Sequence, residues 1–419
     1  MRRVLMVAFH FPPLAVSSGI QRTLRFVQHL PALGWEPIVL TAHPRAYERT
    51  SEDLVAEIPK GALVEHAFAM DTARHLAIGG RYPSFLARPD RWLTWRYGAV
   101  PAGMRIIRRH RPDVIWSTYP IATAHVIGDA LQSATGLPWI ADFRDPMAQE
   151  GYPKDPRTWR CFKRVEERAI ANARFSVFVT PGAARMYRDR YPTMADRIVV
   201  IENGFDEESF AGLAADHASH EPLNPGRITL LHSGIVYPSE RDPTQLFVAM
   251  RRMIERGTLR DGEVKVRFRA AEHDALLRAL ARDNGVEELI ELLPPVPYRA
   301  ALEEMVRADG LLVLQAANCN EQVPAKIYEY LRTGRPIIAL TDPRGDTASV
   351  LRDGGIDTVA RLDSAGDVAA LLGRFVADIR GHRAPTADPS YVARASRRER
   401  AASLAALLDR ASGSSRSSE

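Results

Sequence analysis

The sequence predicts an α/β protein made of two Rossmann-like domains in series, each a doubly wound parallel sheet. Three observations support this fold class: the length of 419 residues, a repeated alternation of apolar strands with helical patterns, and one interruption of that alternation. The length suits two domains of about 200 residues better than one compact domain. Strands that alternate with helices favour right-handed crossovers and parallel sheets.

The first domain is expected over residues 1–205. A helix with apolar side chains at helical spacing is expected from Gly19 to Leu33, ending before Gly34. Short apolar runs of the kind found in buried strands occur at 4–9, 37–41, 113–117, 139–142, 174–180 and 198–202.

The second domain is expected over residues 206–384. It begins with a linker at 212–227, where Gly, Asp, His, Asn and Pro occur without periodicity. A helix is expected at 243–254. Strands are expected at 228–232, 264–269, 290–293, 311–315 and 336–341. Beyond them, residues 391–410 have the composition of a single helix, and the Ser-rich tail 412–419 is expected to be disordered.

Composition excludes several classes of protein. Hydrophobic residues make up 46% and charged residues 26%, as in ordinary globular proteins, and a net charge of +5 is too small to indicate nucleic-acid binding. The two cysteines, Cys161 and Cys319, are far apart and lack metal-site spacing, which favours a reducing compartment. His10 and Pro12-Pro13 interrupt the first apolar run, so it resembles a first strand rather than a signal peptide. A cytoplasmic location is expected.

Two common nucleotide-binding motifs are missing from the sequence. It contains no G-x-G-x-x-G, which argues against a dehydrogenase, and no G-x-x-x-x-G-K-[ST], which argues against a P-loop enzyme.

The most informative segment is 310–340, GLLVLQAANCNEQVPAKIYEYLRTGRPIIAL. It is typical of a strand, a polar loop, a short helix and a second strand. Pro324 suits the first helical turn and Gly334 suits the helix end. The amino end of such a helix presents free N–H groups and partial positive charge, which favours a diphosphate.

Two carboxylates bracket the start of this helix. Glu321 precedes it and Glu329 lies within it, with Lys326 between them. At a rise of ~1.5 Å per residue, the carboxylates are several to ~12 Å apart, a span that suits the two ends of a nucleotide sugar. Lys326 would then hold phosphate charge. The alternative is that both glutamates are solvated surface residues.

This pattern, Glu, seven residues, Glu, then Gly-x-Pro and an apolar strand, resembles the retaining GT-B glycosyltransferases of the group 1, family 4-like superfamily, which includes glycogen synthase and bacterial mannosyltransferases. The resemblance implies two domains facing across a cleft, with the segment 385–411 crossing back to the first domain. It implies sugar transfer from a UDP- or GDP-sugar with retention of configuration, without cofactor or essential metal. Glu321 would contact the sugar and Glu329 the ribose. Where many members have Gly-Phe-Gly, this chain has Gln322-Val323-Pro324, and Val323 is expected on the donor side.

Other donor residues follow from the same comparison. Gly234 comes directly after the strand 228–232 and would let the backbone approach a ligand. Arg241 could bind the diphosphate with two hydrogen bonds, or could be an ordinary surface residue. Gly19 stands where the family commonly has a Gly-Gly pair close to phosphates and acceptor.

The acceptor side is expected where Asp142, Arg144 and Asp145 end a strand of the first domain. Family members often have a histidine near this position, and this chain has Arg144. These side chains either touch acceptor or donor, or form a structural ion pair. The acceptor itself, whether a glycan, a lipid-linked molecule or a small molecule, is left open, as is the role in polysaccharide, glycolipid or glycoconjugate synthesis.

A basic stretch in the first domain suggests contact with an anionic membrane. Arg105, Arg108, Arg109 and Arg111 follow the aromatic side chains Trp92, Trp95 and Tyr97. The alternative is a solvated helix end. Two rival functions also remain: a nucleotide-sugar epimerase or hydrolase of the same fold, and a catalytically inactive nucleotide-sugar-binding protein.

Overall fold

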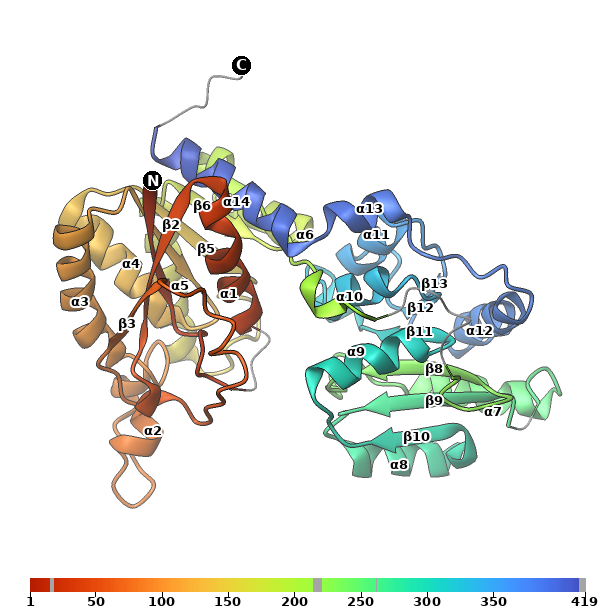
Figure 1. Ribbon diagram of the computed structural model, residues 1–419. Helices are drawn as coiled ribbons and strands as arrows, with labels where there is room; N and C mark the ends of the chain where they lie inside the picture. Colours follow the sequence, from red (N-terminus) through yellow and green to blue (C-terminus); the bar gives the residue numbers. More distant parts are fainter. Residues whose placement is uncertain (16–18, 214–220, 261, 414–419) are drawn as a thin grey trace. The chain divides into compact units, whose positions relative to one another are not determined.

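The computed structural model describes residues 1–15, 19–213, 221–260 and 262–413. The chain forms two compact units (Figure 1). Unit 1 contains Met1–Asn203 and the residues from Arg397 onward, and unit 2 contains Gly204–Ser396. The chain therefore passes between the units twice.

Unit 1 is built on a seven-stranded parallel sheet with the order β3-β2-β1-β4-β5-β6-β7. The strands are β1 (Arg2–Ala8), β2 (Trp35–Ala42), β3 (Leu63–Ala67), β4 (Val114–Thr118), β5 (Trp139–Arg144), β6 (Phe175–Phe178) and β7 (Ile198–Val200). The helices are α1 (Gly19–His29), α2 (Thr72–His75), α3 (Trp95–His110), α4 (Ala122–Thr135), α5 (Pro156–Asn172), α6 (Pro181–Arg190) and α14 (Arg397–Ala411).

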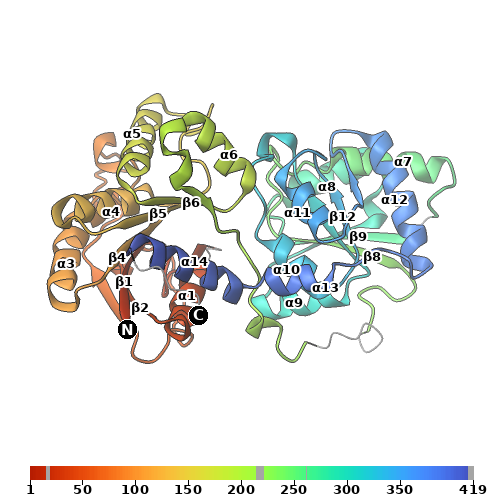
Figure 2. The same cartoon turned by 90° about the horizontal axis from the view of Figure 1, so that it is seen from above.

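Apolar side chains of β1 alternate between the two faces of this sheet. Leu5 and Val7 belong to the core under α3, α4, α5 and α6, whereas Val4 and Met6 belong to the core under α1 and α14. Figure 2 shows these two helical layers on opposite sides of the sheet. Because both faces are covered, β1 reads as a continuous apolar run.

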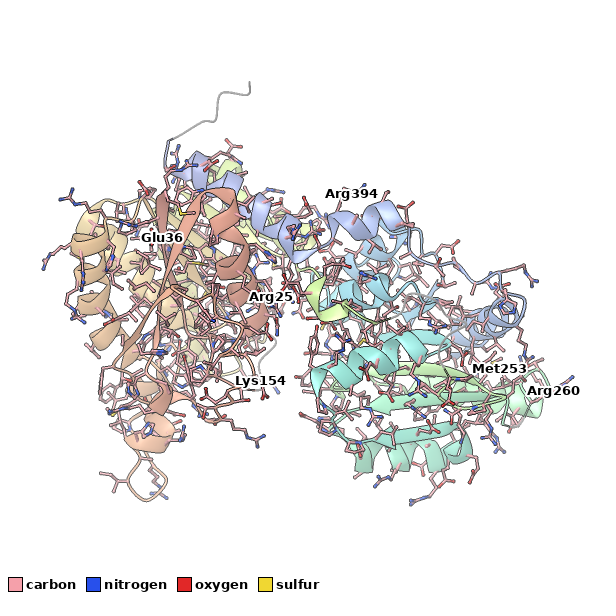
Figure 3. The ribbon with its side chains drawn as sticks, in the orientation of Figure 1. Arg25, Glu36, Lys154, Met253, Arg260 and Arg394 are labelled. Carbon is pink, nitrogen blue, oxygen red and sulfur yellow. The ribbon has the colours of Figure 1, made fainter. Side chains whose placement is uncertain are left out.

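Unit 2 has a six-stranded parallel sheet with the order β10-β9-β8-β11-β12-β13. The strands are β8 (Ile228–Ser233), β9 (Val264–Arg269), β10 (Ile290–Leu293), β11 (Gly310–Leu314), β12 (Ile337–Leu340) and β13 (Val359–Ala360). The helices are α7 (Thr244–Glu255), α8 (Asp274–Asp283), α9 (Tyr298–Arg307), α10 (Lys326–Thr333), α11 (Asp346–Asp353), α12 (Ala365–Arg380) and α13 (Pro389–Arg394). Met253 of α7, labelled in Figure 3, is buried in the core that α7 shares with α12.

These two sheets confirm the predicted fold class, and most predicted strands lie within a few residues of their predicted ends. The single helix predicted at 391–410 is wrong. It is two helices, α13 in unit 2 and α14 in unit 1. The break has a physical cause: Ser396 pairs with Phe205 in an isolated parallel bridge, and the Phe205 N–H donates to the carbonyl of Ala395 at 3.3 Å. Much of the predicted linker (214–220) and of the predicted disordered tail (414–419) lies outside the described residues.

α14 is firmly attached to unit 1. It packs against α1, and the indole N–H of Trp35 on β2 donates to Asp409 of α14 at 2.9 Å. Arg400 of the same helix pairs with Glu202 at 2.5 Å. The last helix thus completes the core of the first unit.

Candidate active site

In unit 2 the first strand, β8, ends in a tight turn at Gly234. The residue has φ of 111°, a conformation that side chains rarely adopt. A Cβ atom at this position would still lie 3.8 Å from Nζ of Lys326, so backbone conformation rather than space requires the glycine. The turn brings the β8 backbone to within contact distance of α10.

Lys326, the first residue of α10, connects to the end of β8. Its Nζ donates to Nε2 of His232 and to the carbonyl oxygen of Ser233, each at 2.9 Å. Nδ1 of His232 lies 3.0 Å from the carbonyl of Leu312, so this nitrogen carries the ring proton and Nε2 accepts. An ammonium has three donors, and two of them are used here.

Electrostatics around Lys326 favour an anion. Burial, followed by the nearby charge of Arg241, holds the pKa of Lys326 well below its usual range, with Glu329 opposing. Burial and the same two cations also hold the pKa of His232 well below its usual range, so the ring is neutral. A phosphate group bound beside these two cations would stabilise both positive charges.

Arg241 is held by the loop that follows β8. It donates to the carbonyl of Ile235 at 2.6 Å, and its guanidinium lies 5.1 Å from the ring centre of Tyr237. In the part of the chain that the structure describes, no carboxylate lies within ion-pair distance of Arg241 or Lys326. Among these residues Arg241 is therefore not paired with its neighbour Asp242. Asp242 instead accepts the N–H of Thr244 at 2.9 Å.

The two glutamates flank Lys326 in the sequence. Glu321 lies in the turn between β11 and α10, and both it and Arg241 act on the thiol of Cys319, whose pKa is raised to about 11 mainly by burial. Glu329 accepts a hydrogen bond from the hydroxyl of Tyr298 at 2.7 Å. Sequence reasoning did not identify Tyr298 or His232 as site residues. The sequence offered only weak indications of these two residues. Tyr298 stands at the start of an expected helix, and His232 stands at the end of an expected buried strand.

Two details of the predicted donor loop differ from expectation. Pro324 precedes α10 instead of lying in its first turn, and the N–H groups of Ile327 and Tyr328 turn back to the carbonyls of Pro324 and Ala325. The helix start therefore offers fewer free donors than expected. The side chain of Val323 is 6% exposed and packs in the core, which leaves its backbone for any contact with a ligand.

In unit 1 Gly19 lies against His10 and Arg144. A Cβ atom on Gly19 would lie 2.5 Å from Nδ1 of His10 and 2.8 Å from Nη1 of Arg144. Only glycine fits at the start of α1 without displacing these groups. The burial of His10 lowers its pKa to about 3, with a further contribution from Arg144, so the imidazole is neutral.

Arg144 has an unusual backbone. Its φ is +61°, and the pairing of β5 with β6 shifts register between Asp142 and Arg144. Its Nη1 lies 3.4 Å from the carbonyl of Tyr119, a long contact, and its Nε is buried without a hydrogen-bond partner. Burial lowers the pKa of Arg144 and raises that of Asp145, while each charge favours the other. Strained residues of this kind occur often at functional sites.

Asp142 is separated from this pair by its own partner. It is fully buried, and both of its oxygens bind Arg22 at 2.9 Å, while Thr118 donates at 2.9 Å. Arg22 also donates to the carbonyls of Ile201 and Glu202. This arrangement favours the structural alternative for Asp142, with Arg22 rather than Arg144 as its partner.

A hollow of about 340 Å³ in unit 1 adjoins His10. Phe9 and Tyr47 meet edge to face with ring centres 5.2 Å apart, and Trp92 lies 4.8 Å from Phe9. The lining consists of Phe9, His10, Leu14, Ala15, Tyr47, Glu48, Arg49 and Trp92. Aromatic walls with a few polar groups are typical of small-molecule sites.

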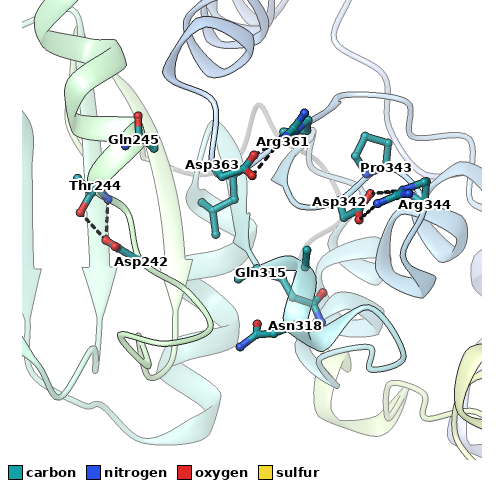
Figure 4. A pocket seen from close by; sticks show the side chains of 13 residues that line it. Asp242, Thr244, Gln245, Gln315, Asn318, Asp342, Pro343, Arg344, Arg361 and Asp363 are labelled. Atoms are coloured by element: carbon teal, nitrogen blue, oxygen red, sulfur yellow. Dashed lines mark hydrogen bonds and ion pairs between the residues drawn. The ribbon is translucent and has the colours of Figure 1, made fainter. Parts of the chain in front are cut away.

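A larger hollow, of about 880 Å³, lies in unit 2 among the loops that follow β11, β12 and β13 (Figure 4). None of the predicted donor residues lines it. Its arginines are already paired, Arg344 with Asp342 at 3.1 Å and Arg361 with Asp363 at 3.0 Å. Lys326 and Arg241, which have no ion-pair partner among the residues that the structure describes, therefore mark the stronger anion site.

The predicted membrane surface is wrong in its aromatic part. Trp95 is fully buried, and Trp92 packs against the core and donates to the carbonyl of Ala46 at 3.2 Å. Only Tyr97, 68% exposed, faces outward, and Arg105 contacts Glu65 at 3.3 Å. Among the residues described, no helix has both the length and the apolar character needed to cross a membrane.

Comparisons with known proteins agree with this fold. Residues 19–209 match the model of Glycosyltransferase Family 4. Among solved structures, the chain resembles a glycosyltransferase from Rickettsia africae (TM-score 0.69, 14% identity, 98% of each chain covered). It also resembles α,α-trehalose 6-phosphate synthase from Burkholderia multivorans (0.66, 13%, 99% of each chain). A third similar structure is HepE from Anabaena in complex with UDP and glucose (0.62, 13%, 99% of this chain and 98% of that one). No curated protein matches the sequence.

The fold is the GT-B fold, with one parallel sheet in each of two α/β units. The match to Glycosyltransferase Family 4 covers most of unit 1.

Proposed function

We propose that the protein transfers a sugar from a UDP- or GDP-sugar to an acceptor with retention of anomeric configuration. The observation that carries the proposal is the pair of cations Lys326 and Arg241, which lie together without a carboxylate partner among the described residues. The similar structure of HepE was solved with UDP and with UDP-glucose, which supports a nucleotide-sugar donor.

Each donor group has a proposed role. Lys326 and Arg241 bind the diphosphate and stabilise the charge that develops on it as the bond to the anomeric carbon breaks. Glu321 orients the sugar hydroxyls and Glu329 binds the ribose, since carboxylates accept hydrogen bonds from hydroxyl groups. Gly234 and the backbone of Val323 border the donor. Because Lys326 and Arg241 stabilise the negative charge of the leaving diphosphate, we expect that the reaction needs neither a cofactor nor an essential metal.

On the acceptor side we propose Gly19, Arg144 and Asp145, together with the aromatic hollow beside His10. Aromatic faces pack against sugar rings, and Arg49 and Glu48 offer hydrogen bonds to hydroxyl groups. An acceptor that carries a sugar, as a glycan or a glycolipid, suits this lining.

Such a reaction belongs to polysaccharide, glycolipid or glycoconjugate synthesis. We place it in the cytoplasm, on the inner face of the plasma membrane.

The test uses Glu321. Glu321→Ala should keep the fold and reduce transfer between about tenfold and more than a hundredfold, the value of a charge-assisted hydrogen bond of about 1.5–3 kcal/mol. Glu255→Ala, which removes an exposed carboxylate of α7 paired only with Arg251, is the matched control. Nucleotide release with and without acceptors is measured on a panel of nucleotide sugars that is first selected by thermal shift.

The same assay separates the rival functions. Turnover of the donor without any acceptor would indicate an epimerase or hydrolase. Stabilisation by a donor without turnover on any acceptor would indicate an inactive binding protein. Full activity of Glu321→Ala would contradict the proposed site, and the anomeric configuration of the product, read by NMR, tests retention.

A further inference from the structure

The segment between β3 and the first turn of α3, residues 68–97, exposes an unusual number of large apolar side chains. Five of the eleven such side chains in the described residues lie in it. They are Phe68 (47% exposed), Ile78 (88%), Tyr82 (37%), Phe85 (66%) and Tyr97 (68%). Figure 1 shows α2 and the loop after it extending away from the end of the sheet. Exposed apolar side chains concentrated in one segment indicate an interaction surface.

The exposed charged side chains of this segment are basic, whereas its acidic side chains bind within unit 1. It contains five arginines, no lysine or glutamate, and two aspartates. Both aspartates are engaged inside the unit: Asp71 is fully buried and binds Arg91 at 2.9 Å, and Asp90 accepts the N–H of Thr123 at 2.7 Å. The exposed charge that remains is basic, at Arg74, Arg81 and Arg96.

The segment is ordered by its own hydrogen bonds. Thr94 donates to the carbonyl of Met70 at 2.7 Å and accepts its N–H at 2.8 Å, which closes the segment at its base. At its tip Ile78 and Arg81 exchange two backbone hydrogen bonds, at 2.9 and 3.1 Å, around Gly79-Gly80. Both glycines have positive φ, as a tight two-residue turn requires. The turn therefore places the exposed side chains of Ile78 and Arg81 next to each other.

We propose that residues 68–97 form the membrane-binding element of the protein, and that it binds an anionic lipid bilayer. Ile78 and Phe85 enter the boundary between headgroups and acyl chains, Tyr82 and Tyr97 lie at headgroup level, and Arg81 and Arg96 contact the anionic headgroups. Tyrosine suits this interface because its ring is apolar and its hydroxyl stays hydrated. Arginine side chains lie along apolar surface while their charged heads reach the phosphates.

This inference goes beyond the proposed reaction and does not depend on it. It moves the membrane contact from the α3 arginines to the segment before them, and of the three aromatic side chains expected at the membrane it retains only Tyr97. Trp92, at the end of the same segment, also lines the aromatic hollow that we assign to the acceptor. A membrane-bound segment would therefore hold that hollow close to a lipid-linked acceptor.

The experiment is flotation of the full chain with vesicles of phosphatidylcholine, with and without phosphatidylglycerol. We expect binding to anionic vesicles at low salt, little binding to neutral ones, and release by salt, which screens charges within about 10 Å at 0.1 M. Ile78→Ser with Phe85→Ser should weaken binding about tenfold to a hundredfold, because two apolar side chains lose their insertion. Leu276→Ser, at a side chain 41% exposed in unit 2, is the matched control and should bind as wild type.

Two further variants distinguish membrane binding by residues 68–97 from membrane binding by the α3 arginines. Arg81→Gln with Arg96→Gln should release the protein, whereas replacing Arg105, Arg108, Arg109 and Arg111 with Gln should have the smaller effect. Release only by the α3 variant would overturn the proposal and leave membrane binding itself in place. Unchanged binding of the Ile78 and Phe85 variant would also overturn it, as would a wild type that ignores anionic vesicles. Loss of self-association without any vesicle effect would assign the surface to a second copy instead.

Discussion

Nζ of Lys326 lies 2.9 Å from Nε2 of His232, a residue 94 positions earlier at the end of β8. This contact joins the first residue of α10 to the neighbouring strand and fixes the direction of the ammonium. Because His232 is neutral and accepts, it positions the lysine without cancelling its charge. His232 is thus a positioning residue for a phosphate-binding cation.

The first prediction concerns diphosphate binding. Lys326→Ala and Arg241→Ala should each weaken binding of a nucleoside diphosphate about tenfold or more, and binding of the nucleoside little. The double variant should lose less than the sum of the two, because both side chains serve one ligand. Calorimetric titration measures this, with Arg251→Ala as a control for an exposed arginine. Normal affinity in both single variants would leave the phosphates to backbone groups alone.

The second prediction follows from the lowered pKa of Lys326. A bound diphosphate stabilises the protonated lysine and therefore raises this pKa. As the pH rises through the lowered pKa of the free protein, Lys326 loses its proton and affinity falls, and binding takes up a proton. Titrations over a series of pH values below the usual pKa of lysine, in buffers of different ionisation enthalpy, measure the uptake. Lys326→Gln should show none; a wild type without uptake at every pH would contradict the protonation argument.

The third prediction compares two glycines. Gly19→Ala places a methyl group 2.5 Å from His10 and 2.8 Å from Arg144. We expect a loss of about 1–3 kcal/mol in the free energy of unfolding, as for overpacking, and impaired transfer. Gly366→Ala, where nothing lies within 4 Å in α12, is the control and should stabilise by up to about 1 kcal/mol. Equal stability of the two variants, measured by urea unfolding, would show that His10 and Arg144 move aside freely.

The fourth prediction distinguishes Asp142 from Asp145. Asp142→Ala leaves Arg22 buried without its partner and should destabilise unit 1 by about 3–5 kcal/mol. Replacing both members, by Asp142→Leu with Arg22→Met, should restore much of this loss. Asp145→Ala should instead keep the melting temperature and reduce transfer. If Asp142→Ala is as stable as the wild type but inactive, Asp142 has a role in the active site and not a structural one.

The sequence predicted the strands that are buried on both faces, because these are continuous apolar runs. It did not predict β3, an edge strand whose side chains are mostly half exposed, or β13, which has two residues. The break between α13 and α14 depends on a bridge to Phe205, a contact across the chain that no local pattern records.

In the candidate site, too, residues within one segment were predicted from the sequence, whereas their partners far away in the sequence were not. Glu321, Lys326 and Glu329 were identified from spacing within one segment. Arg22, the partner of Asp142, and His232, the partner of Lys326, are 120 and 94 residues away from them in sequence. Such partners follow from strand order, which a single sequence does not display residue by residue. The exposed apolar side chains around Ile78 were missed because an apolar residue in a loop has no periodicity.

The double passage of the chain between the units has a consequence for synthesis on the ribosome. Unit 2 is one uninterrupted stretch, whereas the core of unit 1 needs α14, whose Leu404 and Leu408 are 1% and 0% exposed. Domains generally fold in the order in which they emerge. Here residues 1–203 are synthesised before unit 2, yet their core is complete only when α14, which follows unit 2, has left the exit tunnel. During that interval the face of α1 that α14 will cover is open to chaperones.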